Sequence, residues 1–506
     1  MTDVVEVRRG AYQDSVSLMQ VSRQVAAADG VEAAQVAMAT DLNLEVIRGM
    51  GFELPGDLGP NDLLIAIRAG SDAGVTAGRA ALEDALLALR GTGASAGGFG
   101  EALPPRTLGR AVEEAGATLA LVSVPGQYAV TEAFDAIDRG VSVMVFSDNV
   151  SVEDEVALKD AAAGRGVLLM GPDCGTAVVG GVALGFANVV QPGPIGIVAA
   201  SGTGAQEVMA LLDAAGVGVS HCLGVGGRDL SAAVGGRSTR QALAALDADE
   251  ATTAILVVSK PPAPEVLAEL EAYAAGLATP VHWATLGAGR PDLTTAVASA
   301  LAELDHGIPE EWPHWMPLVD AEAGPGAPPR SGGSLRGLFV GGTLADEAML
   351  VAGERLGAIR SNIPLSPELA LGSGLRDRGH VVIDFGDDDL TRGRAHPMID
   401  PSLRMERIVA EAADPTCGVL LLDLVLGHGA HPDPGPELAD AITAARATAA
   451  SDGRELPVVV ALVGTSGDPQ GFSATAEVLA AAGAEVFLSA AEATRRAIQL
   501  LEGGHR

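Results

Sequence analysis

Apolar runs that alternate with helical segments are the dominant pattern along the chain. An apolar run at residues 195–200 is followed by SGTG at 201–204, as in a buried parallel strand that ends in a tight turn. Apolar residues then recur at helical spacing over 205–215, and Gly216 stands where a helix would end. The pattern predicts a strand, a glycine-rich turn and a helix. The free N–H groups at the start of such a helix favour a phosphate or a carboxylate.

The same pattern occurs a second time. From Leu335, LRGLFVGGTLADEAMLVAGERLG holds an apolar run, GGT at 341–343, an acidic first helical turn and an apolar helix closed by glycine. Two later pairs of segments also correspond, namely 254–264 with 419–434 and 280–289 with 457–471. Ligands of parallel sheets gather beyond the carboxyl ends of the strands, so each set of three loops should converge on one site. The alternative is that each turn merely caps a Rossmann-like unit.

The order of strands and helices predicts a multi-domain α/β protein. Residues 1–106 have a βαβαβα rhythm, typical of a small α/β or ferredoxin-like module, and end in a linker-like tract. Residues 107–190 alternate strands and helices as a Rossmann-like sheet does. Two flavodoxin-like domains are then expected at 191–305 and 335–506, with a linker at 306–334.

Composition narrows the range of partners. The formal net charge of -33 argues against nucleic acid or an anionic membrane as partner. It does not exclude small anions, which local helix ends and single arginines can bind. No apolar run reaches the roughly 18 residues that span a bilayer, and the amino terminus lacks an apolar signal segment. Three scattered cysteines fit a reducing compartment and no zinc site, so we expect a cytoplasmic protein without a bound metal.

Several motifs resemble known families. PGQYAVTEAFDAIDRGVSVMVFSDNVSVEDE, GPDCGT, IGIVAASGTGAQE and GVGGRDLS resemble the α subunit of succinyl-CoA synthetases, and the second half resembles the carboxy-terminal domain of the β subunit. Over nearly the whole chain, SVSLM, FSDNV, MGPDCGT, ASGTG, GGRDLS, SKPPA, GGTLA, GRAHPMIDP and GTSGDPQ resemble the FdrA family of acyl-CoA-synthetase-like proteins. This resemblance implies a CoA-binding-type Rossmann-like domain at 107–190, followed by two succinyl-CoA-ligase-type flavodoxin domains.

The chain departs from the succinyl-CoA synthetases in two respects. Those enzymes carry a phosphohistidine in a Gly-His-Ala-Gly loop, whereas here the corresponding strand is followed by GAGRPD at 287–292. His282 lies inside that strand and does not match the motif. No stretch of about 200 residues remains for an ATP-grasp domain. We therefore do not expect this chain alone to run an ATP-driven ligase cycle.

The FdrA resemblance implies oxamate carbamoyltransferase activity in allantoin catabolism. In that reaction carbamoyl phosphate and oxamate interconvert with phosphate and oxalurate, and FdrA works beside companion subunits. We accordingly expect small anionic substrates (carbamoyl phosphate, phosphate and oxamate-like acids), association into an oligomer and no required cofactor.

Candidate site residues follow from the helix ends and from the nearby cations. Attack on a carbamoyl carbon needs positioned N–H donors and one or two cations to stabilise the leaving phosphate. The candidates for binding phosphate or substrate are Ser201, Gly202, Thr203, Gly204, Glu207, Gly341, Gly342 and Thr343. The candidate catalytic residues are Arg228, Lys260, Arg392, Arg394 and His396. The last three lie in GDDDLTRGRAHPMIDP, which could also be a solvated turn of paired Asp and Arg side chains.

Two other functions remain open at this point. One is an acyl-CoA synthetase or CoA-transferring subunit, in which CoA would lie along the second domain, at Pro125, Ser147, Asp148, Asn149, Asp173 and Cys174. The other is a non-catalytic scaffold for companion subunits. Calorimetry with CoA tests the first, and an inert isolated chain that is active in a co-expressed complex would favour the second.

Overall fold

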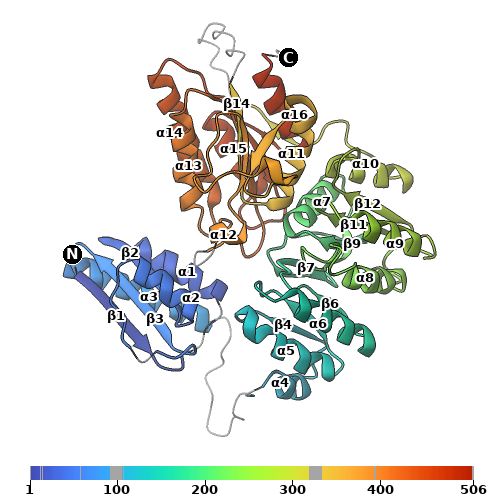
Figure 1. Cartoon of the computed structure of the whole chain (residues 1–506), viewed down its shortest axis with the longest axis horizontal. Coiled ribbons are helices and arrows are strands. Elements are labelled where there is room, and N and C mark those ends of the chain that lie inside the picture. Colours follow the sequence, from blue (N-terminus) through green and yellow to red (C-terminus); the bar gives the residue numbers. More distant parts are fainter. Residues whose placement is uncertain are drawn as a thin grey trace. The chain divides into compact units, whose positions relative to one another are not determined.

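The computed structural model describes residues 2–11, 13, 15–56, 58–91, 105, 107–317, 333–391 and 395–503. They form two compact units (Figure 1). The first comprises Met1–Ala111 with Thr391–Asp400, and the second Val112–Leu390 with Pro401–Arg506. Among the described residues, no helix combines the length and the apolar character that crossing a bilayer requires.

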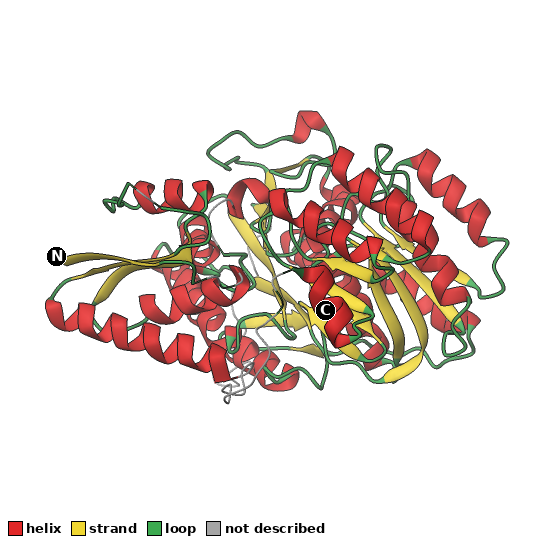
Figure 2. Cartoon of the chain, turned by 90° about the horizontal axis from the view of Figure 1, so that it is seen from below, coloured by secondary structure: helices red, strands yellow, loops and turns green. Residues whose placement is uncertain are grey.

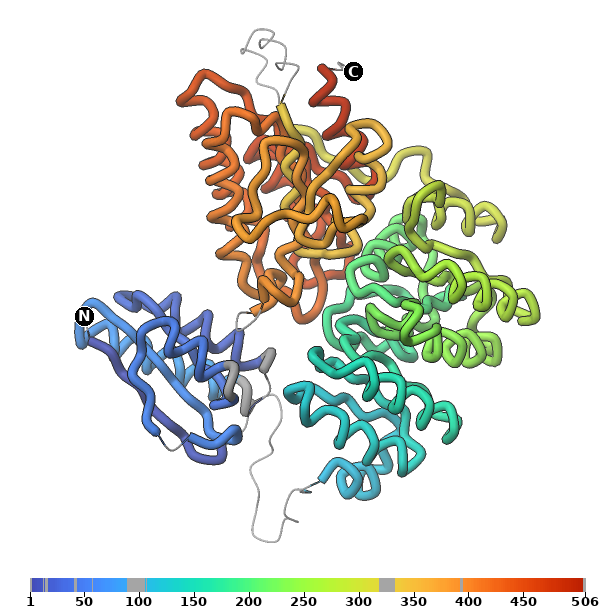
Figure 3. The backbone as a smooth tube through the Cα atoms, in the orientation of Figure 1, coloured from blue at the N-terminus to red at the C-terminus, as the bar shows by residue number. Residues whose placement is uncertain are grey.

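The amino-terminal module is the three-stranded α/β fold that its rhythm predicts, drawn in blue in Figure 3. Its elements are β1 (Thr2–Arg8), α1 (Ser15–Ala26), β2 (Val31–Met38), α2 (Asp41–Gly49), β3 (Leu63–Ala69) and α3 (Asp72–Gly91). The antiparallel sheet has the order β1-β3-β2. Because strand side chains alternate between faces, Ile65 packs in the core with α1 and α3, and Leu64 packs on the other side with α2.

A short parallel sheet, in the order β4-β5-β6, opens the second unit. Its elements are α4 (Leu108–Ala115), β4 (Leu119–Val122), α5 (Gly126–Asp138), β5 (Ser142–Val145), α6 (Val152–Arg165) and β6 (Leu169–Met170). The alternation of strands and helices is Rossmann-like. Ser151 caps α6 by accepting a hydrogen bond from the Asp154 N–H at 3.1 Å.

The first flavodoxin-like half has the strand order β12-β11-β9-β10-β7-β8. Its elements are β7 (Thr176–Val179), β8 (Val182–Gly185), β9 (Pro192–Ala200), α7 (Gly202–Ala214), β10 (Val219–Gly224), α8 (Arg237–Asp247), β11 (Ala254–Ser259), α9 (Pro264–Ala274), β12 (Val281–Thr285) and α10 (Leu293–Glu303). Helix α7 begins three residues before its predicted start, because Ser201 Oγ accepts the Gly204 N–H at 2.9 Å and so caps the helix there.

The second flavodoxin-like half has a seven-stranded sheet, in the order β13-β19-β18-β17-β14-β16-β15. Helices cover both faces of this sheet, with α13 and α14 on one and α11 and α16 on the other (Figures 1 and 2). Its elements are β13 (His314–Trp315), β14 (Ser334–Phe339), α11 (Gly342–Leu356), β15 (Ile359–Ser361), the 3-10 helix η1 (Pro367–Leu369), β16 (His380–Asp384), α12 (Asp388–Thr391), α13 (Ser402–Ala412), β17 (Cys417–Val425), α14 (Pro434–Ser451), β18 (Val458–Val463), α15 (Phe472–Ala481), β19 (Ala484–Phe487) and α16 (Ala490–Leu501).

Each half has a point where the strand order reverses. Strand β9 lies between β10 and β11, and β14 lies between β16 and β17, all of them parallel. In open α/β sheets, ligands bind outside the carboxyl ends of the strands at such switch points. The fold therefore favours sites at the ends of β9 and β14, where α7 and α11 begin.

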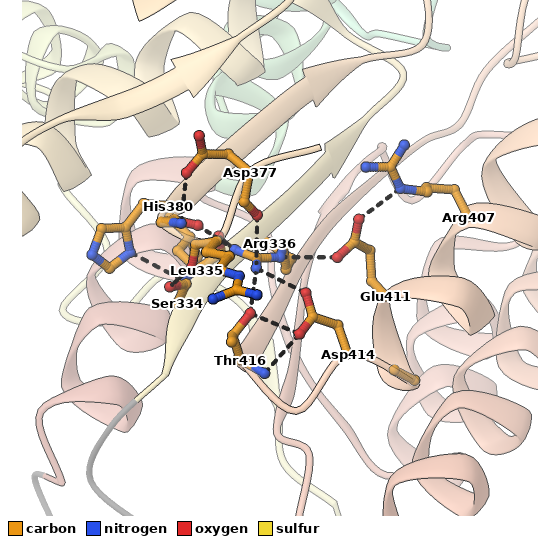
Figure 4. Close-up of polar contacts among 12 residues, drawn as sticks. Ser334, Leu335, Arg336, Asp377, His380, Arg407, Glu411, Asp414 and Thr416 are labelled. Atoms are coloured by element: carbon orange, nitrogen blue, oxygen red, sulfur yellow. Dashed lines mark hydrogen bonds and ion pairs between the residues drawn. The ribbon is translucent and has the colours of Figure 1, made fainter. Parts of the chain in front are cut away.

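A buried arginine ties strands together at the opposite end of the second sheet (Figure 4). Arg336, 1% exposed, donates to Glu411 Oε2 at 2.9 Å and to Thr416 Oγ1 at 2.8 Å, and also to the Gly379 carbonyl. These groups join the amino ends of β14 and β17 to the segment before β16. The cluster is structural, because it lies away from the switch point.

Candidate functional site

The amino termini of α7 and α11 contact each other. Ser201 Oγ and Thr343 Oγ1 are hydrogen-bonded at 2.6 Å, and both residues are buried. Next to them the backbone of one half meets a side chain of the other, since a Cβ added to Gly341 would lie 2.8 Å from Thr203 Oγ1. The two turns that the repeat singles out thus lie side by side within the second unit.

Only some N–H groups at these turns are available to a ligand. The Gly204 N–H donates to Ser201 Oγ, and the Gly341 N–H donates to Asp423 Oδ2 at 3.0 Å. The part of the chain that the structure describes supplies no acceptor for the N–H groups of Gly202, Thr203, Gly342 and Thr343. Of these four, all but Thr343 are partly exposed. The accessible donors therefore lie at the edge of the helix–helix contact.

A buried ion pair holds the second turn in place. Asp423, at 0% exposure, accepts the Val340 and Gly341 N–H groups and the Arg404 Nη1 at 2.9 Å. Burial raises the pKa of Asp423, and the Arg404 guanidinium opposes that rise. Sequence reasoning missed this pair, although an aspartate inside the apolar run VLLLDLV is a visible signal.

Lys260 and two carboxyl groups flank the exposed end of α11. A Cβ added to Gly342 would lie 2.9 Å from Lys260 Nζ and 2.7 Å from Asp384 Oδ2. Asp346 lies one turn into α11 and is 7% exposed. Burial raises the pKa of Asp384 to about 7 and that of Asp346 to about 6, and in both cases Lys260 acts in the opposite direction. Sequence reasoning nominated Lys260 but neither aspartate.

Glu207 and Glu347 lie inside the contact between the halves. Glu207 Oε1 accepts the Ala490 N–H at 2.8 Å, and Glu347 Oε1 accepts the Leu293 N–H at 2.7 Å. Each carboxyl group therefore caps a helix of the opposite half, α16 or α10. Burial raises the pKa of both. The sequence placed Glu207 beside the bound group, but its carboxyl group is fully buried against α16 because that helix start supplies an N–H donor.

Arg228 is held by the Rossmann-like part of the unit. Its Nη2 lies 2.9 Å from Glu155 Oε2 and donates to the Val150 carbonyl at 2.8 Å, while nearly half of the side chain remains exposed. Glu155 is in turn paired with the buried Lys159 at 2.7 Å, which also contacts Asp229. The guanidinium is thus already neutralised in part by this network.

The loops expected to carry CoA pack tightly against one another. Ser147 Oγ accepts the Val124 N–H at 3.1 Å, and Pro125 stands at the N-cap of α5. A Cβ added to Gly126 would lie 2.3 Å from the Asp148 carbonyl oxygen and 2.6 Å from that of Asn149. Carbonyl oxygens therefore face the start of α5, where a phosphate would need N–H donors.

The remaining candidates of the CoA-type site differ in accessibility. Cys174 is 2% exposed, its Sγ contacts the Thr176 carbonyl oxygen at 3.5 Å, and burial raises the pKa of this thiol to about 12. Asp173 is exposed, yet crowding by protein atoms and the charges of Asp388 and Asp148 raise its pKa to about 7. Cys174 is thus a protonated core residue at neutral pH.

His396 belongs to the first unit. Its Nδ1 accepts the Met398 N–H at 3.2 Å, and burial lowers the pKa of the imidazole to about 4. Arg23 of α1 donates to the Ile399 carbonyl at 2.7 Å, so this segment packs on the amino-terminal module. Arg392 and Arg394 lie outside the described residues. His396 is therefore neutral at pH 7 and belongs to a different unit from the helix termini.

The motif GTSGDPQ contributes hydrogen bonds between the two halves through Asp468. The Asp468 carboxylate accepts Asn188 Nδ2 at 2.7 Å and the N–H groups of Val189 and Thr465 at 2.8 Å each. Gln470 bonds both backbone groups of Gly427. The Asp468 carboxylate thus joins the two halves through Asn188 and Val189, whereas Gln470 fixes the loop after β17 within the second half.

Known proteins share this architecture. Residues 1–101 match the family described as AllF, heavy metal-associated domain, and residues 338–500 match CoA-ligase. The chain is 39% identical over 499 residues to YahF of Escherichia coli K12, covering 96% of this chain and 95% of YahF. It is 30% identical over 154 residues to the succinate–CoA ligase [ADP-forming] subunit alpha 2 of Archaeoglobus fulgidus, covering 30% of this chain and 52% of that protein.

Among solved structures, the dinucleotide-forming acetyl-coenzyme A synthetase 1 of Ca. Korarchaeum cryptofilum matches 76% of this chain and 84% of its own, at 16% identity and a TM-score of 0.26. The two flavodoxin-like halves, joined at their helix termini, define a protein of the CoA-ligase-type α/β class. With its amino-terminal module and its full-length relationship to YahF, the chain belongs to the FdrA-like family of acyl-CoA-synthetase-like proteins.

The residues of the amino-terminal module do not fit a heavy metal. Residues 1–101 contain neither cysteine nor histidine, the ligands that soft and borderline metals prefer. Across the described residues, no group of three or more His, Cys, Asp or Glu could hold a metal ion. The loop after β1 is held instead by Asp62, which accepts the Gly10 N–H at 3.0 Å and pairs with Arg9 at 2.7 Å.

Proposed function

We propose that this chain transfers a carbamoyl group between phosphate and a small acid amide, as a subunit of an oxamate carbamoyltransferase. The observation that supports this most is the pair of helix termini with unoccupied N–H groups beside Lys260. Such a cradle suits phosphate oxygens, because the free N–H donors belong to two helix termini that contact each other and are partly positive.

The transfer needs little covalent chemistry from the protein. The nitrogen of the acid amide attacks the carbamoyl carbon, the bond from that carbon to the bridging oxygen breaks, and phosphate leaves with the electron pair. The nitrogen then loses a proton. N–H groups of Gly202, Thr203 and Gly342 would hold the phosphate oxygens, and Lys260 would neutralise the charge that develops on them.

Two features favour a reaction of diffusible carbamoyl phosphate over one through a phosphohistidine attached to the chain. The loop after β12, from Gly287 to Arg290, contains no histidine. Moreover, the hydrogen bond between Ser201 and Thr343 brings the two helix ends together, so that a third protein segment cannot lie between them. A substrate that enters at the exposed edge, near Gly342, avoids both obstacles.

An acyl-CoA synthetase subunit is the second candidate, and the match of residues 338–500 to the CoA-ligase family favours it. CoA carries a 3′-phosphate and a diphosphate, which proteins usually bind with cations and free N–H groups. At the Rossmann-like loops the chain offers the carboxylates Asp148 and Asp173, and Arg228 there is already paired with Glu155. These charges favour the carbamoyl transfer. Association with companion subunits, as a catalytic or scaffolding partner, is part of the same proposal.

Phosphate release from carbamoyl phosphate in the presence of oxamate tests the proposal on the purified chain and on the co-expressed complex. Lys260→Met should abolish turnover while leaving the melting temperature near that of the wild type. Thr203→Phe should also abolish turnover, but it should melt at a lower temperature because Thr203 packs against Gly341. Thr343 is unsuitable for a bulky substitution, because it is 1% exposed and bonded to Ser201. Unchanged phosphate release in both variants would refute the assignment, and tight calorimetric binding of CoA would favour the ligase alternative.

A further inference from the structure

Two largely buried carboxyl groups at the candidate site keep oxygens that reach solvent and have no hydrogen-bond partner among the described residues. Asp346, 7% exposed, makes no hydrogen bond or ion pair with the described residues through its side chain. Asp384, 4% exposed, accepts the Gly386 N–H through Oδ1 at 2.8 Å, whereas Oδ2 has no such partner. None of these oxygens belongs to the fully buried atoms without a partner, so they can accept a hydrogen bond from a ligand in solution beside the accessible end of α11.

Lys260 does not supply that donor. Its charge influences both carboxyl groups, yet its Nζ lies within 4.0 Å of neither. Asp384 Oδ2 and Lys260 Nζ instead stand on either side of Gly342, 2.7 Å and 2.9 Å from the position of an added Cβ. The exposed end of α11 thus presents hydrogen-bond donors and a cation together with two acceptors.

The two carboxylates weaken the binding of a plain phosphate or carboxylate, because they repel its negative charge and find no donor on it. A divalent cation is also a poor fit, since the described residues hold no group of three or more candidate ligands and the Lys260 ammonium lies alongside. A molecule with anionic oxygens at one end and N–H groups at the other satisfies every group present.

We propose that Asp346 and Asp384 accept hydrogen bonds from the amide nitrogen of the substrate and thereby select carbamoyl and other amide-bearing anions over acyl analogues of the same shape. The inference rests on the proposed function, whose phosphate cradle holds the other end of the same molecule. The inference adds Asp346 and Asp384 as the residues that determine specificity for the amide. A site built to hydrogen-bond an N–H group rejects an analogue without it, because the polar groups of the site are then left unpaired.

A pair of stable ligands isolates this effect. Phosphonoacetamide and 2-oxopropylphosphonate share a phosphonate and a carbonyl group and differ in an NH₂ in place of a CH₃. Calorimetry on the full chain should give a dissociation constant at least about tenfold lower for the amide. Asp346→Leu should reduce this preference severalfold, and adding Asp384→Ala should bring the two constants within about twofold of each other.

Controls separate this specificity from folding and from metal binding. Glu354→Leu, at an exposed carboxylate on the same helix, should leave the preference unchanged. Asp346→Ala serves as a second variant if Asp346→Leu melts at a lower temperature than the wild type. Equal binding of the two phosphonates by the wild type, a preference that survives in the double variant, or a preference that requires added Mg²⁺ would each overturn the inference.

The outcome is distinguishable from that of the proposed function. A wild-type chain that prefers the amide but releases no phosphate from carbamoyl phosphate and oxamate would refute the transfer reaction and leave the selection of an amide standing. Binding of neither phosphonate would overturn both, because both depend on the anion cradle.

Discussion

The anion cradle consists of the free N–H groups of Gly202, Thr203 and Gly342 beside Lys260. It should bind a small anion more tightly as the pH falls, mainly because the Asp384 carboxyl group becomes neutral. This carboxyl group adjoins the exposed end of α11, and burial raises its pKa to about 7. Above that pH the group is a carboxylate that repels a bound anion, and below it the group is neutral. Asp346, with a pKa raised to about 6, adds a second step in the same direction.

The structure sets the size of the effect. Because Asp384 Oδ2 lies 2.7 Å from the Cβ position of Gly342, an anion bound to that helix end would lie about 6 Å from the carboxylate. Two unit charges at about 6 Å, with an effective dielectric constant of about 20, repel each other by about 3 kcal/mol. Lys260 and solvent reduce this value. We therefore expect about a tenfold gain in affinity, or about 1.4 kcal/mol, between pH 8.5 and 5.5.

Sulfate is the appropriate probe, because its charge does not change in this pH range. Calorimetric titrations at several pH values should show the affinity rising mainly between about pH 8 and pH 6. Asp384→Asn should bind tightly throughout with only the smaller dependence due to Asp346, whereas Glu354→Gln should behave like the wild type. A wild-type affinity that does not vary with pH, or an Asp384→Asn variant that keeps the full dependence, would refute the reasoning.

Three further predictions concern the contact between the halves and the core. Burial raises the pKa of the Glu347 carboxyl group to about 8. The protonated group therefore contributes fully to folding stability below the unfolded pKa of 4.5, and this contribution is lost as the pH rises through the folded pKa. Glu347→Gln should flatten the resulting fall in melting temperature between pH 5 and 9. Asp468→Ala leaves three donors unmatched and should cost about 3 kcal/mol, measured by calorimetric melting, and an unchanged melting temperature would contradict this role of Asp468. Cys174 should resist iodoacetamide in the native chain and react in urea, with rapid native alkylation as the opposing result.

The elements that could be read from the sequence are those encoded locally. The strand, turn and helix around residues 201–204 and 341–343 are specified by adjacent residues, and Ser201 as a cap shifted only the start of α7. Because the strand order reverses at β9 and at β14, each turn lies at the switch point of its own sheet. The resemblance to a family identified the duplicated architecture for the same reason, since its motifs lie at these turns.

The features that sequence reasoning missed depend on contacts between distant segments. Asp384 and Lys260 are separated by more than a hundred positions. They come together only because β11 and β16 flank β9 and β14, the strands at which the order reverses in the two halves. The segment Thr391–Asp400 gave no sign that it packs with the amino-terminal module, because such packing depends on surface shape. Likewise, the repeat groups the loop in 457–471 with those expected to converge on one site, whereas its Asp468 bonds Asn188.

The direct contact between α7 and α11 constrains any chemistry at this site. In the interior of the contact, Ser201 and Thr343 satisfy each other, and Gly341 fits only because it lacks a side chain beside Thr203. The free N–H groups are therefore displaced to the edge, where Lys260 and Asp384 lie within reach of the same ligand. A reacting group that is attached to the chain would have to separate the two halves, whereas a small soluble substrate can enter from the side. The same geometry that excludes a carrier loop thus favours a reaction between diffusible molecules.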